Sequence, residues 1–471
     1  MPALRRTHRR SASAHPTPVK RLPLALTVLL TGTFIGTTSN SVVNVPLVDI
    51  MAEFDAPFAK GAFVVIGFLI AMAASMPLVG WAGDRFGRRR VYCGALVGSA
   101  VCSVGAATAP TLDALIAWRV LDGTFTATFA PVVMGLITWL AGPERRVRAV
   151  SAWAGVNGAA QAVGPSLGGF ITQVAGWRWI FVPVPPLAMI ALVGTLILIP
   201  RYPAQRISLD RLGAVTLTLS STLLLLALSL LPMTGMPNWV APALLGAAAA
   251  LGGVYIWHSL RAPKPFIDLR AVAQTRYRRS AVAAMAHMFA LGATLLSVPL
   301  HLREYGFASG TVGLIVLALP VTLVLVAPFI GAVGERFGPR RLMRIGLVIL
   351  GCAQIGIGVA LNPVPPPVVV VTGLLVANGI GMGFIQTLAA AGTTRSAAGA
   401  SGSGLGLFNL LRFGSSATGG AWVSASVLLS GSPLFIFAGT AGAAAIALVV
   451  SFVGRNPEDD AAQRVSIAST V

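Results

Sequence analysis

The sequence predicts an all-α integral membrane protein with 14 transmembrane helices, arranged as two six-helix bundles plus two extra central helices. The composition is 55% hydrophobic and only 10% charged, and the mean hydropathy of +0.81 is far above that of a soluble protein. Apolar runs of about 20 residues, the length that a helix needs to cross about 30 Å of hydrocarbon, recur from Leu22 to Phe452. A segment that follows the second run returns later in the chain, which indicates two similar halves.

The apolar runs are separated by short polar segments, which place the span boundaries to within a few residues. In chain order we expect spans at 22–46, 61–82, 91–109, 113–140, 149–174, 179–200, 212–233, 239–258, 280–301, 309–333, 342–361, 366–391, 400–429 and 433–453. Residues 1–21 are rich in Arg, Ser, Thr, His and Pro, and we expect them to form a disordered tail. The apolar run that follows is too long for a signal peptide and lacks a small-residue cleavage site.

The distribution of positive charge predicts the orientation. A net charge of +20 would suggest a nucleic-acid partner in a soluble protein, but here the charges fall in short segments between apolar runs. With a cytoplasmic amino terminus, the inner loops, the span ends next to them and both tails hold 29 of the 34 Lys and Arg, and the outer loops hold only Lys60, Arg178 and Arg303. We therefore expect both termini in the cytoplasm, a monomer in the lipid bilayer and no nucleic-acid partner. The remaining two, Arg119 and Arg412, lie within spans.

An internal repeat indicates how the spans are grouped. The segment GWAGDRFGRRR from Gly80 returns as GAVGERFGPRR from Gly331, at an offset of 251 residues. Each copy follows an even-numbered span on the cytoplasmic side, so the two halves run in parallel. A six-span half needs about 200 residues, and the surplus of about 50 matches two inserted spans.

This arrangement divides the chain into five segments. We expect a basic cytoplasmic tail at 1–21, an amino-terminal six-helix bundle at 22–200, two inserted spans with cytoplasmic linkers at 201–279, a carboxy-terminal six-helix bundle at 280–453 and a cytoplasmic tail at 454–471.

The first copy of the repeat carries a known motif. It resembles the GxxxDRxGRR loop between the second and third spans of the major facilitator superfamily, and the matching residues are Gly80, Asp84, Arg85, Gly87, Arg88 and Arg89. The resemblance implies the major facilitator fold and a gating role for this loop. A carboxylate at a helix end among arginines can form charge-assisted bonds that break when the halves rock. The alternative is a basic loop that only sets the topology.

A second motif in the fifth span points to the direction of transport. Gly164, Pro165, Gly168 and Gly169 resemble the GPxxGG motif of the superfamily's antiporters. Small residues let helices approach closely, and a proline bends its helix and frees a backbone carbonyl. Helix packing alone is the alternative.

Three further segments are similar to the 14-span drug:proton antiporter family of the EmrB and QacA type. They are Trp177 to Phe181 before the sixth span, Asp210 to Gly213 at the seventh, and Phe408 to Gly414 in the penultimate span. The resemblance implies a transporter of the bacterial inner membrane. It would export amphipathic organic compounds, such as drugs, antibiotics or a natural product, in exchange for protons.

The sequence departs from this family at the positions that would bind protons. The family's acidic residue in the first span is replaced by Ser39, and its RxxQG motif reads Arg119 to Gly123 with Asp122 in place of Gln. Asp122 is the only carboxylate that we place well inside a span. Arg119 and Asp122 lie one helical turn apart and can pair. A buried charge costs about 2.5–3.5 kcal/mol on insertion scales, so the pair serves either proton coupling or a permanent structural ion pair.

Polar residues within spans are candidates for a central cavity. They are Asn40, Asn44, Asn157, Gln161 and Arg412. The two amide pairs are spaced i, i+4 and so share a helix face, and hydrogen bonding between helices is the alternative role. His287 is a further group that can titrate near neutral pH.

The sequence also excludes several functions. Cys93, Cys102 and Cys352 lie inside apolar runs, so we expect neither a disulfide framework nor a metal site. No nucleotide loop or set of nucleophile and base appears, so we expect no cofactor and disfavour a membrane enzyme or sensor. A facilitator or importer on the same fold stays open because the first-span acid is missing. The single membrane carboxylate favours a cationic substrate.

Overall fold

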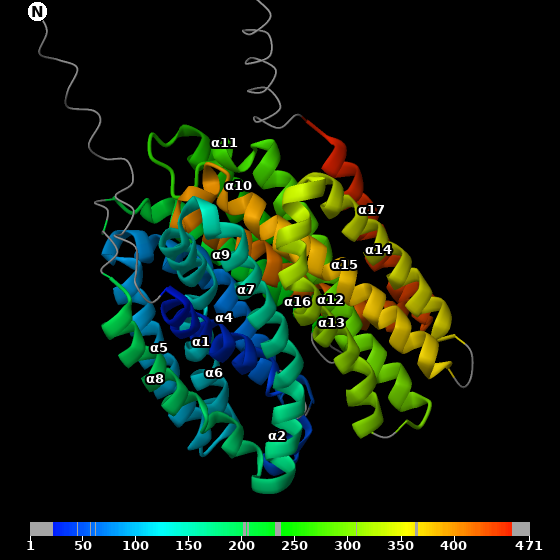
Figure 1. The fold of residues 1–471 in the computed structure, drawn as a ribbon. Coiled ribbons are helices and arrows are strands. Elements are labelled where there is room, and N and C mark those ends of the chain that lie inside the picture. The colour runs from blue at the N-terminus through cyan, green and yellow to red at the C-terminus, as the bar shows by residue number, and fades with distance from the viewer. Residues whose placement is uncertain are drawn as a thin grey trace, which may run out of the picture.

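Helices make up nearly all of the computed structural model, which describes residues 22–44, 46–56, 58–61, 63–200, 204, 207–230, 237–307, 309–362 and 366–454. No strand occurs among these residues, so the prediction of an all-α protein is confirmed. The helices of the amino-terminal part gather on one side of the molecule and those of the carboxy-terminal part on the other (Figure 1).

The amino-terminal helices are α1 (Leu22–Ser41), α2 (Leu47–Glu53), α3 (Phe58–Gly61), α4 (Phe63–Phe86), α5 (Arg88–Ala107), α6 (Leu112–Thr126), α7 (Phe129–Ala175), the 3-10 helix η1 (Trp177–Phe181) and α8 (Val184–Leu198). The long helix α7 turns at Gly142, whose φ of 68° is open to glycine and strained for other residues. It therefore contains the end of the expected fourth span and all of the fifth. Helix α1 ends five residues before the expected boundary at 46, and this moves Asn44 out of the helix.

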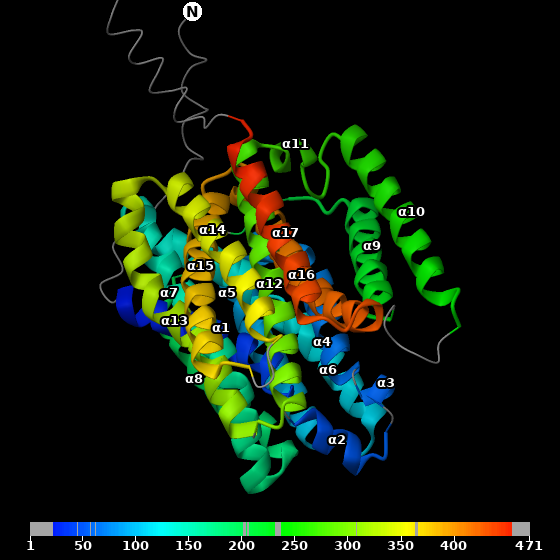
Figure 2. The ribbon, with the colours of Figure 1, turned by 90° about the vertical axis from the view of Figure 1, so that its right-hand side faces the viewer.

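The remaining helices are α9 (Arg211–Leu230), α10 (Val240–Arg261), α11 (Leu269–Val272), α12 (Thr275–Glu304), α13 (Ser309–Phe337), α14 (Pro339–Ala360), α15 (Val368–Thr394), the 3-10 helix η2 (Ala398–Ala400), α16 (Gly402–Leu429) and α17 (Pro433–Phe452). Figure 2 shows α9 and α10 as a pair at the side of the bundle. Helix α9 packs on α4 and α16, one helix from each part of the chain, so the inserted pair lies at the seam between them.

Eleven stretches of the described chain are long and apolar enough to cross a membrane. The expected fourth span is one of them, as the continuous apolar stretch Leu112–Gly142 formed by α6 and the start of α7. Three further helices occupy positions of expected spans but are not among the eleven: α7 beyond Gly142, α13 and α16. The structure thus supports a multi-pass membrane protein, and the count of fourteen stays a prediction.

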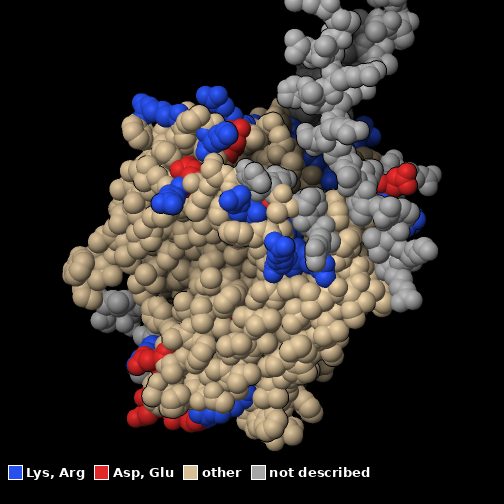
Figure 3. All heavy atoms as spheres, turned by 90° about the vertical axis from the view of Figure 1, so that its left-hand side faces the viewer, with Lys and Arg blue, Asp and Glu red and all other residues tan. Residues whose placement is uncertain are grey.

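Charged side chains gather at the two ends of the molecule, and an uncharged band separates them (Figure 3). Many large apolar side chains of the described helices are exposed, among them Ile197, Leu314 and Val369. A soluble protein rarely exposes so much contiguous apolar surface, whereas a lipid-facing surface requires it.

The sequence repeat is also a structural repeat. Gly87 and Gly338, which stand 251 residues apart, both have a positive φ, 95° and 84°, and each begins a helix, α5 and α14. The second residue after each glycine is an arginine, and it has the same role in both copies. Arg89 donates to the carbonyl of Leu196 near the end of α8, and Arg340 donates to that of Ser451 near the end of α17. Basic groups stabilise the negative end of a helix, so each loop fastens the last helix of its half.

Candidate functional site

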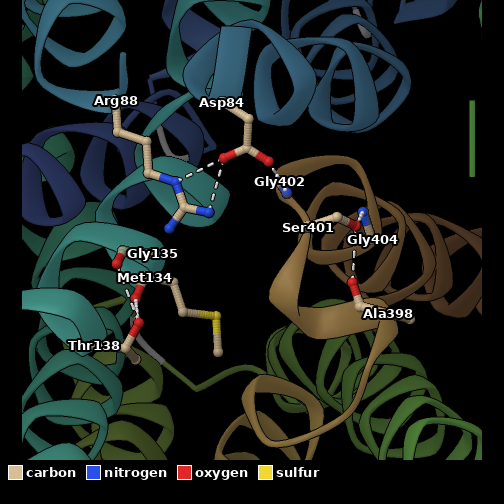
Figure 4. A network of polar contacts seen from close by, with 9 residues as sticks. All are labelled: Asp84, Arg88, Met134, Gly135, Thr138, Ala398, Ser401, Gly402 and Gly404. Atoms are coloured by element: carbon tan, nitrogen blue, oxygen red, sulfur yellow. Dashed lines mark hydrogen bonds and ion pairs between the residues drawn. The ribbon is translucent and has the colours of Figure 1, made fainter. Parts of the chain in front are cut away.

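A latch joins the two parts of the chain at the end of α4 (Figure 4). Asp84 accepts hydrogen bonds from Arg88 Nε and Nη2 at 3.0 and 2.9 Å, and its second oxygen accepts one from the backbone N–H of Gly402. Gly402 is the first residue of α16, where free N–H groups attract negative charge. We call Gly80, Asp84, Arg88 and Gly402 the α4–α16 latch. Asp84 and Arg88 are both buried, so the charges of this pair are shielded from water.

Glycine is required at the latch because the two backbones touch. A Cβ on Gly80 would overlap the carbonyl oxygen of Gly402, and a Cβ on Gly402 would overlap the carbonyl oxygen of Gly80. Any side chain at either position therefore separates α4 from α16.

Not all of the predicted gating residues take part in the latch. Arg85 is exposed, and of the arginines in the motif it is Arg88 that binds Asp84. Arg89 is bound within its own half, and Gly87 forms the turn between α4 and α5. In the second copy, the side chain of Glu335 lies outside the described residues.

The predicted pair of Arg119 and Asp122 forms a buried charge node. Arg119 Nη1 lies 3.4 Å from Asp122 Oδ2, and the two residues are 1% and 3% exposed. Asp122 Oδ1 also accepts hydrogen bonds from Ser99 Oγ at 2.7 Å and from Thr126 Oγ1 at 3.2 Å. The carboxylate thus has three partners, and two of them are neutral hydroxyls.

Arg119 connects the charge node to two other helices. Its Nη2 donates to the carbonyl of Ser39 on α1 at 3.0 Å, and its Nε donates to that of Val64 on α4 at 3.2 Å. Ser39 is the position where the resemblance would place an acidic residue. Arg119, which binds the Ser39 carbonyl, instead pairs with a carboxylate on its own helix, that of Asp122.

A pocket lies beside the charge node. It holds about 320 Å³ of empty space, a volume that includes its side open to solvent. Its lining residues are Thr33, Gly36, Thr37, Asn40, Met72, Met76, Thr126, Phe129, Ala130, Asn157 and Phe413. Thr126 both lines the pocket and donates to Asp122, so one hydroxyl separates the carboxylate from the pocket. Apolar and aromatic walls with a few polar groups are typical of a site for a small organic molecule.

The predicted cavity residues divide into two groups. Asn40 and Asn157 line the pocket, and Gln161 donates to Asn157 at 2.8 Å. The expectation for Asn44 was wrong, because it is exposed in the turn after α1 and shares no helix face with Asn40. Arg412 is buried but does not line the pocket.

The GPxxGG segment packs α7 on the end of α1. A Cβ on Gly164 would overlap Ser41, and a Cβ on Gly168 would overlap the carbonyl oxygen of Val42. Pro165 and Gly169 are half-buried. These contacts hold the amino-terminal helices together.

The WRWIF segment forms a clamp with α2 at the other end of the molecule. Glu53 accepts hydrogen bonds from Trp177 Nε1 at 2.6 Å and from Arg178 Nη1 at 2.5 Å. The bond from Arg178, with that from Trp177, holds the pKa of the Glu53 carboxyl below its usual range.

Sequence reasoning missed three residues that complete the site. Thr126 is four residues from Asp122, a spacing that could have identified it. Ser99 and Gly402 carried no signal, because each meets its carboxylate only through packing of separate helices. The described residues contain no group of three or more His, Cys, Asp or Glu that could hold a metal ion.

Comparison with known proteins agrees with this architecture. The family model of the major facilitator superfamily matches residues 29–257 and 280–469. A multidrug resistance protein B homolog of Mycobacterium tuberculosis is 30% identical over 352 residues, which are 73% of this chain and 64% of that protein. The tetracenomycin C resistance and export protein of Streptomyces glaucescens is 27% identical, over 74% of this chain and 66% of its own length. The chain thus spans somewhat under two thirds of these relatives.

Solved structures show the same fold at low identity. A human organic anion transporter, MFSD10, aligns with a TM-score of 0.65 at 16% identity and covers 92% of this chain and 99% of its own. The proton:xylose symporter XylE aligns with a TM-score of 0.67 at 14% identity, over 93% and 97% of the two chains. Both share the fold with this chain. The family match over most of its length shows that the protein belongs to the major facilitator superfamily.

Proposed function

We propose that the protein is a secondary active transporter that exports amphipathic organic compounds in exchange for protons. In this proposal it has fourteen spans, in bundles at 22–200 and 280–453 with an inserted pair within 201–279. It acts as a monomer in a bacterial inner membrane with both termini cytoplasmic. Relatives named for multidrug resistance and antibiotic export support the direction of transport.

The observation that carries the proton coupling is the position of Asp122. Among the described side chains it is the only carboxylate far from the ends of an expected span, and the Thr126 hydroxyl joins it to the pocket. A proton that crosses about 100 mV releases about 2.3 kcal/mol, enough to sustain a gradient of about 50-fold for a neutral substrate exchanged one for one. One titrating carboxylate therefore suffices.

Helix α4 connects this carboxylate to the latch. Arg119 holds the carbonyl of Val64 at one end of α4, and Asp84 holds α16 at the other end. Protonation of Asp122 removes the charge that orients Arg119, and this weakens the hold on α4. Release of the latch then lets the two halves rock, and the substrate and the proton use the same cavity in turn.

The test is Asp122→Asn in proteoliposomes. We expect loss of uphill export driven by an imposed pH gradient, with substrate binding and downhill exchange retained because the amide keeps the shape of the site. Retained pH-driven accumulation by the well-folded variant would contradict the proposal. If the pair is only structural, the variant lowers the yield of folded protein, and the double variant Arg119→Gln with Asp122→Asn restores both yield and coupled transport.

A facilitator or importer on the same fold is the second candidate, and a comparison between the halves favours it. Gly123 packs on the carbonyl of Phe68 as Gly379 packs on that of Leu319, so the residues before them, Asp122 and Asn378, are equivalent. Asn378 accepts a hydrogen bond from Gln354 in a neutral buried network. A polar residue at this position can therefore serve packing alone. Proton flux that follows substrate flux in proteoliposomes distinguishes the exporter from the facilitator.

A further inference from the structure

Arg412 is a buried cation without a carboxylate partner. It is 2% exposed in the middle of α16, and its one described hydrogen bond is from Nη1 to Asn409 Oδ1 at 3.1 Å. Its Nη2 is buried and has no hydrogen-bond partner. Within the described part of the chain, no acidic residue pairs with it. Arg119, which is equally buried, has a carboxylate and two carbonyls.

Aromatic rings surround the Arg412 guanidinium. Its carbon Cζ lies 5.3 Å from the ring centroid of Trp153, 5.3 Å from that of Phe413 and 5.8 Å from that of Phe408. Ring faces attract a cation but leave its net charge unchanged. A guanidinium cannot lose its proton in a protein, so one positive charge remains uncompensated inside the membrane.

His287 on α12 adds unused hydrogen-bonding capacity to the same place. It is fully buried, neither ring nitrogen has a partner, and its helix packs along α16, the helix that carries Arg412. The indole N–H of Trp153 is also buried without a partner. Native proteins satisfy nearly all buried polar groups, so several unsatisfied donors around one cation indicate a ligand that the chain does not supply.

This cluster adjoins the pocket. Phe413, the neighbour of Arg412 in the chain, is a lining residue of the pocket. Trp153 lies one helical turn before Asn157, which is another lining residue. The pocket thus extends to Phe413, one of the three rings around the Arg412 guanidinium.

We propose that Arg412 and His287 bind the acidic group of the substrate, so that the transported compounds are aromatic monoanions with a carboxylate or an ionised phenol. The guanidinium can donate to such a group in bidentate fashion, and the rings of Trp153 and Phe408 stack on the adjoining aromatic system. This inference rests on the proposed transport function and names its substrate class. It replaces the cation that the single membrane carboxylate had suggested, because Arg119 already neutralises that carboxylate.

The test is equilibrium binding to the purified full-length chain in detergent at pH 7, with three matched probes: 2-naphthoate, 2-naphthamide and 2-naphthylmethylammonium. We expect the carboxylate to bind at least tenfold more tightly than the amide, and the ammonium to bind most weakly. Arg412→Gln abolishes this preference, Arg412→Lys retains part of it, and His287→Gln reduces it. Arg148→Gln is the matched control, because it removes an exposed arginine. Equal binding of all three probes, or an unchanged preference in Arg412→Gln, would overturn the proposal.

A second measurement, the melting temperature of the ligand-free protein, tests the proposal even if the probes bind weakly. Removal of an uncompensated buried charge relieves a cost, so Arg412→Gln should melt at or above the wild-type temperature. Arg119→Gln should melt well below it, because Asp122 is left without its cation. A loss in Arg412→Gln as large as that in Arg119→Gln would assign Arg412 to packing and overturn the inference. Equilibrium binding needs no proton gradient, so failure of proton coupling does not affect this result.

Discussion

Arg119 and Arg412 are both buried, but their surroundings differ, and this difference decides what each can do. Each of the three guanidinium nitrogens of Arg119 donates a hydrogen bond, and these bonds connect it to Asp122, α1 and α4. Arg412 keeps an unused donor and a net charge. A satisfied ion pair is rigid and changes only when one member is protonated, whereas an unsatisfied cation attracts a ligand. We therefore propose that Arg119 serves proton coupling and that Arg412 serves substrate recognition.

Thr126 offers a test of the route between the pocket and Asp122. Thr126→Val keeps the shape of the side chain and removes the hydroxyl that donates to the carboxylate. Asp122 still accepts hydrogen bonds from Ser99 and Arg119, so we expect the free energy of unfolding to fall by only about 1 kcal/mol. Initial rates of pH-driven export in proteoliposomes should fall several-fold, and Thr126→Ser should restore them. Wild-type rates in Thr126→Val would mean that protons reach Asp122 by another route.

At the scale of helices, α4 and α16 form one of the two extensive contacts between the halves, and α7 and α13 form the other. The contact of α4 with α16 depends on a glycine pair and on one carboxylate at a helix start. Helix α9 packs on both of them through an apolar cluster that includes Ile70, Ala214 and Leu407. The inserted helix α9 therefore stabilises the contact between α4 and α16. We expect this packing and the α4–α16 latch to influence how the halves move.

A larger side chain at the α4–α16 latch should shift the protein away from the conformation in which α4 and α16 are in contact. In Gly80→Val the added side chain cannot coexist with the carbonyl of Gly402, so α4 and α16 must separate. We expect a polar thiol reagent to label a single cysteine introduced near the latch faster than in wild type, after replacement of the three native cysteines. Transport should fall at least tenfold. Gly246→Val on α10 is the control, since nothing lies within 4 Å of the added Cβ. Unchanged labelling would argue against the latch.

The inserted pair is held at its end by Asp210. This carboxylate accepts hydrogen bonds from the backbone N–H groups of Gly213 and Phe266, both at 3.0 Å, and contacts His258 Nε2 at 2.9 Å. Partial burial raises the pKa of the Asp210 carboxyl, but these three bonds outweigh burial and the pKa lies below its usual range. A lowered pKa stabilises the fold at neutral pH, and this contribution is lost as the pH falls below about 4.

Asp210→Asn tests this attachment. The Asn side chain has one acceptor oxygen, whereas Asp210 accepts at two. We therefore expect the free energy of unfolding to fall by about 1–3 kcal/mol at neutral pH. The melting temperature of the variant should also depend less on pH between about 5 and 3 than that of wild type. The exposed neighbour Asp268, changed to Asn, serves as the comparison, because its backbone contact lies outside this cluster. The same acid dependence in Asp210→Asn as in wild type would exclude this role.

For the whole molecule, the charge pattern leads to a topology that can be measured. Reporter fusions or thiol labelling should place residues 1–21, the loop 259–279 and the segment after Gly454 in the cytoplasm, because these segments carry the excess of Lys and Arg. The clamp of Glu53 with Arg178 should be accessible from the other side. An extracytoplasmic segment at either end of the chain would overturn the count of fourteen spans.

The sequence alone determined the features that depend on local patterns. Apolar length indicated the membrane helices, and the repeat from Gly80 and Gly331 predicted two equivalent halves. In the structure, Gly87 and Gly338 form matching turns with positive φ. The pairing of Arg119 with Asp122 was predictable because both lie on one helix at a spacing of three residues. Such features need only the geometry of a single helix.

Tertiary structure decided which partners meet across helices. Asp84 reaches Gly402, 318 residues away, and Ser99 reaches Asp122 from another helix. Early termination of α1 removed Asn44 from the cavity, and packing left Arg412 without a counter-ion. These outcomes follow from how whole helices pack in space, which no single segment encodes, because the energy of a buried charge depends on every group that packing brings within a few ångströms of it.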